Sequence, residues 1–388
     1  MSADTNLFDT PFGGFSLHRY PPRKKGGQAP LRAWDAADEY LLHWLHDNQD
    51  LDVANNRSLI CNDAFGALSL ALHHLHPVNQ GDSWLAHRAC QENLAHNGMS
   101  GDNVVCIDSL TTPEQTLALV VIKVPKTLAL LEDQLYRLRP RITENTCVVA
   151  AGMTKNIHTS TLKLFESIIG PTRTSLAKKK ARLIFCQPQP QQWQHQSPYP
   201  SYYTLENSGY RIGNHANVFS RANLDIGTRL MLEHMNALPG ADDIIDLGCG
   251  NGLLGLMAKA RQPESRVGFF DESYMALASA RENLQNALGP DALNDCQFLA
   301  NNCLEGVATA SADLVLNNPP FHQGNVVGDH IAWQMFQDAR RVLKPGGQLW
   351  VIGNRHLNYH TKLKKLFGNC RVQGSNRKFV VLVTTCRT

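Results

Sequence analysis

The sequence predicts an α/β protein built from two tandem domains, each with a mostly parallel sheet, that are duplicates of one fold. The chain has 388 residues, whereas single domains commonly have ~100–200. In both halves, short apolar strands alternate with helical segments, which is the pattern of a parallel sheet with crossover helices. A segment rich in Gln and Pro separates the halves.

The boundary between the halves is predicted at residues 187–200, which read QPQPQQWQHQSPYP. Six of these fourteen residues are Gln and four are Pro. Proline lacks a backbone donor and restricts its φ angle, so the segment cannot lie inside a helix or a central strand. We therefore predict a linker here, with a first domain at 1–186 and a second domain at 201–388.

The first predicted elements of the second domain are the strand Asp243–Leu247 and a helix whose first part is Leu253–Ala260. The further strands are Arg266–Phe270, Gln297–Ala300, Asp313–Asn317, Gln348–Ile352 and Lys378–Val383. The further helices are Tyr274–Ala287 and Ile331–Leu343. The sequence Lys344-Pro345-Gly346-Gly347 must end the last helix, because Pro and Gly both break helical structure.

The first domain repeats this order. Its predicted strands are Leu59–Cys61, Val104–Ile107, Leu119–Lys123 and Arg182–Phe185. Asp82-Ser83 opens a helix, and leucines at positions 128, 131, 135 and 138 recur at helical spacing. The separation of matching segments grows from about 186 to about 198 residues along the chain, which indicates an internal duplication.

The sequence predicts a folded protein, and we expect no membrane segment, signal peptide or disulfide frame. The longest uninterrupted apolar stretch, Leu117–Ile122, is far shorter than the ~20 residues of a spanning helix. Asp4 and Asp9 lie in an N-terminus that lacks the apolar core of a signal peptide. Ten cysteines are scattered without any Cys-x-x-Cys pair. This pattern favours reduced thiols in the cytoplasm over disulfides or a metal site.

The charge is nearly balanced in both halves. Residues 1–194 contain 19 basic and 18 acidic side chains, and residues 195–388 contain 18 and 16. Neither half is a strongly basic clamp for nucleic acid, so an RNA partner must be contacted by local patches. The candidate patches are Arg23-Lys24-Lys25, Arg137/Arg139/Arg141, Lys123 with Lys126, and Lys178-Lys179-Lys180.

The sharpest motif is the loop Asp246–Gly252, with the sequence DLGCGNG, which follows a strand and opens a helix. Glycines allow a tight turn and a close approach of the backbone to a ligand, and the N-terminus of a helix favours polar groups. At the end of the next strand, a carboxylate can accept both ribose hydroxyls of a nucleoside. The predicted cofactor residues of this region are Asp246, Gly248, Cys249, Gly250, Gly252 and Asp271.

Two cofactors fit this loop. Gly250, Gly252 and Gly255 satisfy the Gly-x-Gly-x-x-Gly fingerprint, so NAD is an alternative. Asp246 and Gly248 extend the motif to Asp-x-Gly-x-Gly-x-Gly, which is the pattern of Rossmann-like enzymes that use S-adenosylmethionine (SAM). We therefore favour SAM.

A second motif, Asn318-Pro319-Pro320-Phe321, follows the strand Asp313–Asn317, at the edge where such sheets bind ligands. It suits methyl transfer to a planar nitrogen. The Asn318 side-chain oxygen and the Pro319 carbonyl can accept the two N–H bonds of an exocyclic amine, while Phe321 can stack on the ring. All four residues are predicted to be catalytic, and Asn318 is also expected to lie beside the cofactor.

At these residues the second half resembles the class I SAM-dependent methyltransferases, and Asn-Pro-Pro-Phe resembles their amino-methylating branch. Segments 217–221 and 224–230 are similar to those of the ribosomal RNA guanine-N2 methyltransferases. With its duplicated first half, the chain resembles the bacterial 23S rRNA enzymes of the RlmG type, whose close relatives are of the small-subunit RsmC type. The resemblance implies two Rossmann-like domains, each with a seven-stranded sheet whose last strand is antiparallel.

The resemblance also implies roles for further residues. Asn302 falls where many such enzymes place an Asp on the adenine amine, and Phe219 and Asp225 are expected to border the acceptor site. The implied reaction moves the methyl group of SAM to the N2 amine of a guanine in 23S rRNA, without a metal. A cytoplasmic monomer is expected.

The first half is expected to position RNA and to bind no SAM. When the two halves are aligned, Ile60 corresponds to Asp246. Of the three glycines of the cofactor loop, the first half keeps one, Gly66. Lys123-Val124-Pro125-Lys126 replaces Asn317-Asn318-Pro319-Pro320 in this alignment, so cations replace oxygen acceptors. Lys123 and Lys126 would repel a cationic cofactor but can contact phosphate.

The alternatives differ in the acceptor or in the chemistry. The same motifs could methylate a guanine of 16S rRNA, a protein glutamine or a DNA adenine, but enzymes of the last two kinds commonly carry Tyr where Phe321 stands. An NAD-dependent oxidoreductase would not need the motif Asn318–Phe321. A non-catalytic RNA-binding protein is disfavoured because the second half keeps every motif that the first half has lost.

Overall fold

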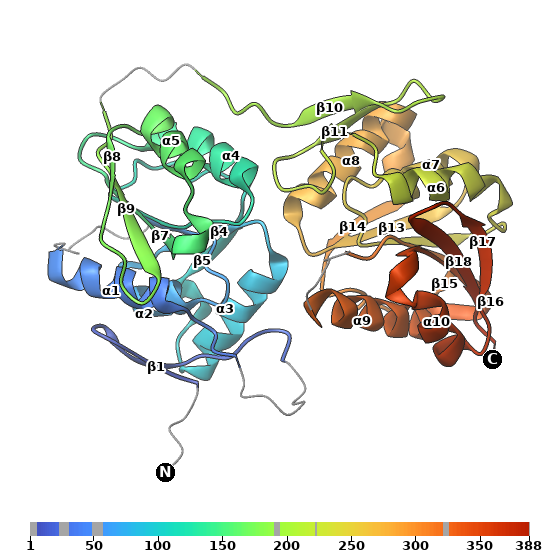
Figure 1. The fold of residues 1–388 in the computed structure, drawn as a ribbon, viewed down its shortest axis with the longest axis horizontal. Helices are drawn as coiled ribbons and strands as arrows, with labels where there is room; N and C mark the ends of the chain where they lie inside the picture. Colours follow the sequence, from blue (N-terminus) through green and yellow to red (C-terminus); the bar gives the residue numbers. More distant parts are fainter. Residues whose placement is uncertain are drawn as a thin grey trace, which may run out of the picture. The chain divides into compact units, whose positions relative to one another are not determined.

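Each half of the chain forms a seven-stranded mixed sheet with helices on both faces (Figure 1). The computed structural model describes residues 6–22, 31–48, 57–189, 195–221, 223–320 and 326–387. The chain divides into two compact units, Met1–Pro198 and Tyr199–Thr388. The first unit is coloured blue to green in Figure 1, and the second yellow-green to red.

The first unit begins with the antiparallel hairpin β1 (Leu7–Thr10) and β2 (Gly13–Ser16). Its sheet contains β3 (Ser58–Cys61), β4 (Val78–Gly81), β5 (Val105–Asp108), β6 (Leu119–Lys123), β7 (Cys147–Met153), β8 (Thr172–Thr174) and β9 (Ala181–Cys186). Its helices are α1 (Ala36–Asn48), α2 (Ala67–Ala71), α3 (Trp84–His96), α4 (Leu128–Leu138) and α5 (Thr159–Ile168).

The second unit begins with the antiparallel hairpin β10 (Ser201–Thr204) and β11 (Arg211–Asn214). Its sheet contains β12 (Asp243–Leu247), β13 (Arg266–Asp271), β14 (Cys296–Ala300), β15 (Ala312–Asn317), β16 (Leu343–Asn354), β17 (Arg371–Ser375) and β18 (Phe379–Thr385). Its helices are α6 (Ile226–His234), α7 (Leu253–Arg261), α8 (Tyr274–Leu288), α9 (Val326–Val342) and α10 (Tyr359–Phe367).

The two sheets have the same topology. The strand order is β5-β4-β3-β6-β7-β9-β8 in the first unit and β14-β13-β12-β15-β16-β18-β17 in the second. In both units the first five strands of that order are parallel, and β9 or β18 runs antiparallel to its neighbours. The predicted fold class, two tandem domains of this architecture, is therefore confirmed.

Two apolar layers cover the two faces of each sheet. In the second unit, α6, α7 and α8 contribute buried residues such as Met231, Leu256 and Leu284 to one layer. Helices α9 and α10 contribute Phe336 and Leu363 to the layer on the other face. The first unit repeats the arrangement, with α1, α2 and α3 in one layer and α4 and α5 in the other. Parallel strands that are buried on both faces are the expected result of crossover helices.

A matching pair of asparagines reveals the duplication at the level of single hydrogen bonds. Asn93 on α3 donates to the Phe65 carbonyl at 2.8 Å, and Asn283 on α8 donates to the Asn251 carbonyl at 3.0 Å. Each asparagine also exchanges hydrogen bonds with an N-terminal segment of its unit, at His18 in the first and Gly213 in the second. Both units thus hold the loop after their first sheet strand in the same way.

Several elements were not predicted from the sequence, including both small hairpins and the strands β4, β7, β8 and β17. The sequence of β4 is VNQG, with one apolar residue, so neither alternation nor an apolar run marks it. An apolar run as short as that of β7 can belong to a buried helix as well as to a strand. Within the described ranges, no helix combines the length and apolar character that crossing a membrane requires.

Candidate active site

The glycine loop joins β12 to α7 through three residues with positive φ. These are Gly248 at +68°, Gly250 at +54° and Gly252 at +74°. Residues other than glycine rarely adopt this backbone conformation. A Cβ atom on Gly252 would lie 2.5 Å from the Cβ of Ala280, so this glycine is needed for packing against α8. A Cβ on Gly250 would meet no atom within 4 Å, so the backbone there faces open space that a ligand can approach.

Asp246, the fourth residue of β12, anchors the helix that follows the loop. Its side chain is 1% exposed, and its Oδ2 accepts a hydrogen bond from the Gly255 backbone amide at 2.7 Å. Burial raises the pKa of this carboxyl to about 8, against the lowering effect of the Gly255 amide. Asp246 therefore fixes the start of α7 against the strand.

Asp271, at the end of β13, links the glycine loop to the neighbouring strand. Its Oδ2 accepts from the Gly250 amide at 2.9 Å, and its Oδ1 accepts from the Ser273 amide at 3.0 Å. Burial raises the pKa of this carboxyl, while the two amides act in the opposite direction. The carboxylate predicted for a ribose thus lies beside the loop, at the carboxyl edge of the sheet.

The acceptor motif follows β15, the strand next to β12. The Asn318 amide nitrogen donates to Thr228 Oγ1 at 3.0 Å and to Asp225 Oδ2 at 3.4 Å. A carboxylate can only accept, so this contact fixes which end of the amide is the oxygen. The Asn318 Oδ1 atom is buried and accepts no hydrogen bond from the described residues. Such an orphaned acceptor is expected where a ligand donates.

Asn317 brings the two loops together. Its side-chain nitrogen donates to the Leu247 carbonyl at 2.7 Å, at the start of the glycine loop. A Cβ atom on Gly248 would lie 4.0 Å from the same nitrogen. The cofactor motif and the acceptor motif, predicted separately, therefore meet at one edge of the sheet.

The sequence placed Asp225 at the border of the acceptor site, but it did not reveal the hydrogen bonds that support these loops. Asp225 is the N-cap of α6, where its carboxylate accepts from the Thr228 amide at 2.9 Å as well as from Asn318. Asn251 donates to the Asn214 side chain at 3.0 Å, which ties the glycine loop to the hairpin β10–β11. An Asp just before an apolar helical segment is a signal for an N-cap, but nothing in the sequence links Asn214 to Asn251.

Comparisons with known proteins agree with this geometry. A family model described as the RLMG N-terminal domain matches residues 5–190, and one described as the methyltransferase small domain matches residues 209–383. "Ribosomal RNA large subunit methyltransferase G" of Aeromonas salmonicida is 53% identical over 97% of this chain and 98% of its own length. The protein of the same name from Streptomyces avermitilis is 48% identical over 96% and 97%.

The chain belongs to the ribosomal RNA large subunit methyltransferase G family. The resemblance expected from the sequence motifs is thereby confirmed. The fold of this family member matches a solved structure of the Thermus thermophilus 16S rRNA N2 G1207 methyltransferase (RsmC) in complex with AdoMet and guanosine. The TM-score is 0.72, and the match covers 98% of this chain and 97% of the other at 20% identity, so it shows the shared fold.

The other predicted site residues of this methyltransferase differ in their surroundings. Cys249 is buried, and burial raises the pKa of its thiol. Asn302 donates to Glu305 at 3.0 Å and accepts from Gln334 at 3.1 Å, so both ends of its amide have partners within the unit. Phe219 is 70% exposed. Pro319 is buried and Pro320 partly buried, while Phe321 lies outside the described residues, as does Arg23-Lys24-Lys25.

In the first unit of the methyltransferase, the structure corrects the repeat alignment by one residue. Cys61 pairs with Ile122 as Leu247 pairs with Asn317, so Lys123 occupies the position of Asn318. The expectation that Lys123 replaces Asn317 is therefore wrong. Sequence alone missed the shift because the register is fixed by backbone pairing between strands, which apolar runs such as β6 leave ambiguous.

Lys123 is also not the exposed cation that phosphate contact requires. Its ammonium group lies 2.8 Å from Asp35 Oδ1 and 2.6 Å from Asp38 Oδ1, and its side chain is 15% exposed. These partners match Asp225 and Thr228, the partners of Asn318 in the second unit. The remaining predicted contacts, Lys126, Lys178, Lys179 and Lys180, are exposed.

Proposed function

We propose that this protein transfers the methyl group of SAM to the N2 amine of a guanine in 23S rRNA. The observation that carries the proposal is the buried Asn318 Oδ1, which has no donor among the described residues and lies on the loop beside the glycine motif. The membership of the large-subunit family and the AdoMet and guanosine in the structural relative support the same acceptor and cofactor.

The residues at the sheet edge fit SAM. Gly250 presents its backbone to open space, Asp271 ends the next strand, and buried Asp246 holds the loop in place. These are the groups that would hold the nucleoside and methionine parts of the cofactor. When bound, SAM supplies a methyl group on a positively charged sulfur that a nitrogen lone pair can attack.

The chain's own contribution is to orient the amine and stabilise the charge that develops on it. The exocyclic amine of guanine is a weak nucleophile because its lone pair is delocalised into the ring. Asn318 Oδ1 and the Pro319 carbonyl would accept its two N–H bonds, so that the lone pair points toward the methyl group. Asp225 and Thr228 accept hydrogen bonds from the amide nitrogen of Asn318, and this would keep its oxygen turned toward the guanine amine.

The first unit would position the RNA rather than react with it. At the position of Asn318 the first unit has Lys123, whose charge is compensated by two carboxylates. A lysine side chain has no oxygen that could accept the N–H bonds of a guanine amine. Gly81 stands where the second unit has Asp271, so the carboxylate for a ribose is missing as well. We therefore assign the transfer reaction to the second unit alone.

The test is methyl transfer from labelled SAM to total rRNA from cells that lack this protein, followed by nuclease digestion. We expect label in 23S rRNA as N2-methylguanine. N318A should reduce turnover by about 100-fold or more, because it removes an acceptor that acts in the transition state, while its affinity for SAM stays close to that of the parent. The exposed Asn48→Ala change is the control. Label in 16S rRNA, in protein or as methyladenine would refute the proposed acceptor.

A further inference from the structure

Both sheets carry two consecutive basic residues at the tip of their last hairpin. In the first unit these are Lys179 and Lys180, between β8 and β9, and in the second they are Arg377 and Lys378, between β17 and β18. All four side chains are exposed, and Lys179 is 69% exposed. The duplicated fold therefore has cations at the same place in both copies, although the copies differ in every motif residue for the cofactor except one glycine.

These tips lie at the carboxyl edge of the parallel strands, which is also the edge of the active site. Ala181 pairs with Met153, the last residue of β7, and Phe379 pairs with Asn354, the last residue of β16. In each unit a backbone hydrogen bond joins the tip to the turn that follows this strand. The Thr154 amide donates to the Lys180 carbonyl at 2.8 Å, and the Arg355 amide donates to the Lys378 carbonyl at 3.0 Å.

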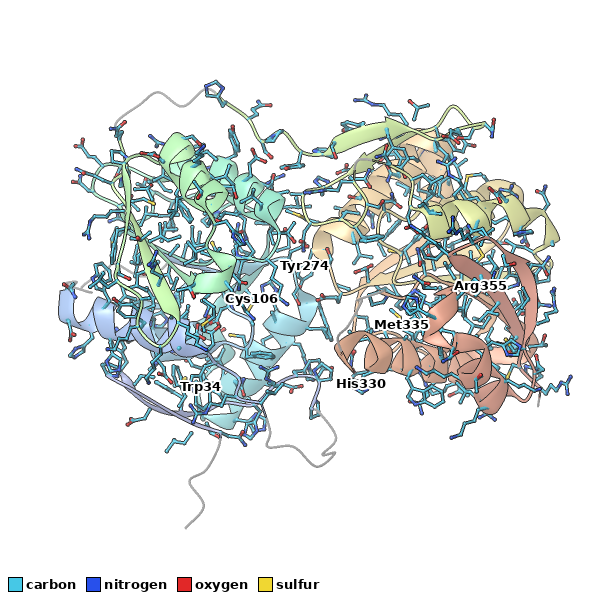
Figure 2. The ribbon with its side chains drawn as sticks, in the orientation of Figure 1. Trp34, Cys106, Tyr274, His330, Met335 and Arg355 are labelled. Carbon is cyan, nitrogen blue, oxygen red and sulfur yellow. The ribbon has the colours of Figure 1, made fainter. Side chains whose placement is uncertain are left out.

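The turns contribute further exposed cations to the two tips. Lys155 follows Thr154 in the first unit, and Arg355, labelled in Figure 2, is itself exposed in the second. We call the two clusters the cationic edges. The first consists of Lys155, Lys179 and Lys180, and the second of Arg355, Arg377 and Lys378.

The lysine pair of the first unit occupies a backbone conformation that its side chains disfavour. Lys178 and Ala181 exchange two backbone hydrogen bonds, so Lys179 and Lys180 form a two-residue turn with φ of +49° and +62°. Asn-Gly is the pair that such a turn prefers. Lys179 gains an ion pair with Glu39 at 2.8 Å, but an exposed pair of this kind adds little stability. Packing therefore gives no reason for two lysines at this position.

We propose that both cationic edges bind the phosphate backbone of the substrate RNA. RNA presents closely spaced negative charges, and exposed lysines and arginines on flexible stems bind them without reading the base sequence. The second edge would hold phosphates next to the reacting nucleotide. The first edge would keep this function in a unit that has lost the chemistry. The identity of the RNA rests on the proposed function, whereas the location of the contacts rests on the two hairpins.

The first test replaces the strained turn of the full-length protein by its preferred sequence. K179N/K180G removes two charges and gives the turn the residues that fit it, so it should unfold at the same or a higher temperature than the parent. Binding is measured with a 23S rRNA transcript over a range of salt concentrations. We expect weaker binding and a slope of log affinity against log salt that is smaller by about 1.4 to 1.8, the value for two lost phosphate contacts.

A second variant and a matched control complete the experiment. R377Q/K378Q should reduce the slope by a similar amount, because it removes the two charges of the second tip. K364Q/K365Q removes two exposed charges from α10, away from the hairpin tips, and should leave the slope unchanged. If both tip variants keep the parent's slope of log affinity against log salt while the parent methylates rRNA, RNA binding by the cationic edges is refuted and the proposed function is not. A parent that methylates no rRNA would instead contradict the proposed function.

Discussion

At the scale of single residues, one position at the sheet edge has been used in two ways. Asn318 offers a buried oxygen that accepts from no donor in the described part of the chain, whereas Lys123, its counterpart, is paired with Asp35 and Asp38. Burial raises the pKa of Asp38 to about 6 despite the nearby ammonium group. Removing one partner of such an ion pair leaves an uncompensated buried charge, which commonly costs ~3–5 kcal/mol.

K123N in the first unit should therefore lower the free energy of unfolding by about 3 kcal/mol or more at neutral pH. Adding D38T recreates the Asn and Thr pair of the second unit, and the double variant should recover much of the loss. Denaturant unfolding of the full chain measures both effects. The idea fails if K123N is as stable as the parent, or if D38T adds a further loss to it.

Asp246 predicts a pH dependence of stability. Its carboxyl has a pKa of about 8 in the folded protein and ~3.9 when unfolded, so the folded state binds the extra proton between these values. The stability that this group contributes is complete below about pH 4 and is lost as the pH rises through about 8. D246N keeps an oxygen for Gly255 but cannot ionise. In unfolding titrations without cofactor, the free energy of unfolding of D246N should increase relative to that of the parent as the pH rises. A difference between the two proteins that does not change with pH would refute this.

At the scale of elements, two glycines of the loop after β12 have different surroundings. Gly252 touches α8, whereas Gly250 faces open space, although both have positive φ. The sequence motif predicts that both residues bind the cofactor and cannot distinguish their surroundings, because that distinction depends on where α8 packs.

G252A should lower the free energy of unfolding by about 2–4 kcal/mol, since it combines an unfavourable φ with an overlap against Ala280. G250A should cost about 1–2 kcal/mol, because only the backbone conformation is affected. For SAM binding we expect the opposite order. Calorimetry should show a larger loss of SAM affinity for G250A than for G252A, although G250A is the more stable variant. Equal stability of the two variants would contradict the division of tasks.

The motif-bearing elements could be predicted from sequence because glycine loops and strand-ending Asn-Pro-Pro-Phe are local patterns. Strand β4 could not, since its VNQG sequence becomes a strand only through pairing with its neighbours. Lys123 was misplaced by one residue for a related reason, as its position depends on how β6 pairs with β3. The partners Asp35 and Asp38 lie more than eighty residues away in the chain. No local pattern connects them to Lys123.

At the scale of the whole molecule, each unit contains its own sheet and its own apolar layers. No buried cluster among the described residues combines side chains of both units. Units of this kind can fold independently. The proposed division of labour, with RNA positioning in the first unit and transfer in the second, then becomes separable by experiment.

A fragment of residues 199–388 should fold and bind SAM with an affinity close to that of the full chain. Its affinity for a 23S rRNA transcript should be lower, because the phosphate contacts of the first unit are gone. Circular dichroism and calorimetry establish that the fragment is folded before RNA binding is measured. Undiminished RNA affinity in a folded fragment would rule out a positioning role for the first unit.

The asparagine that each unit uses to hold its loop grips a backbone carbonyl, at Phe65 in one copy and at Asn251 in the other. A carbonyl is present whatever side chain the residue carries. This contact therefore does not depend on which side chain stands at that one position, and Phe65 and Asn251 can differ while the asparagine still holds the loop. In a duplicated chain of this kind, the binding residues of one unit can change while the other unit keeps the residues of the proposed reaction.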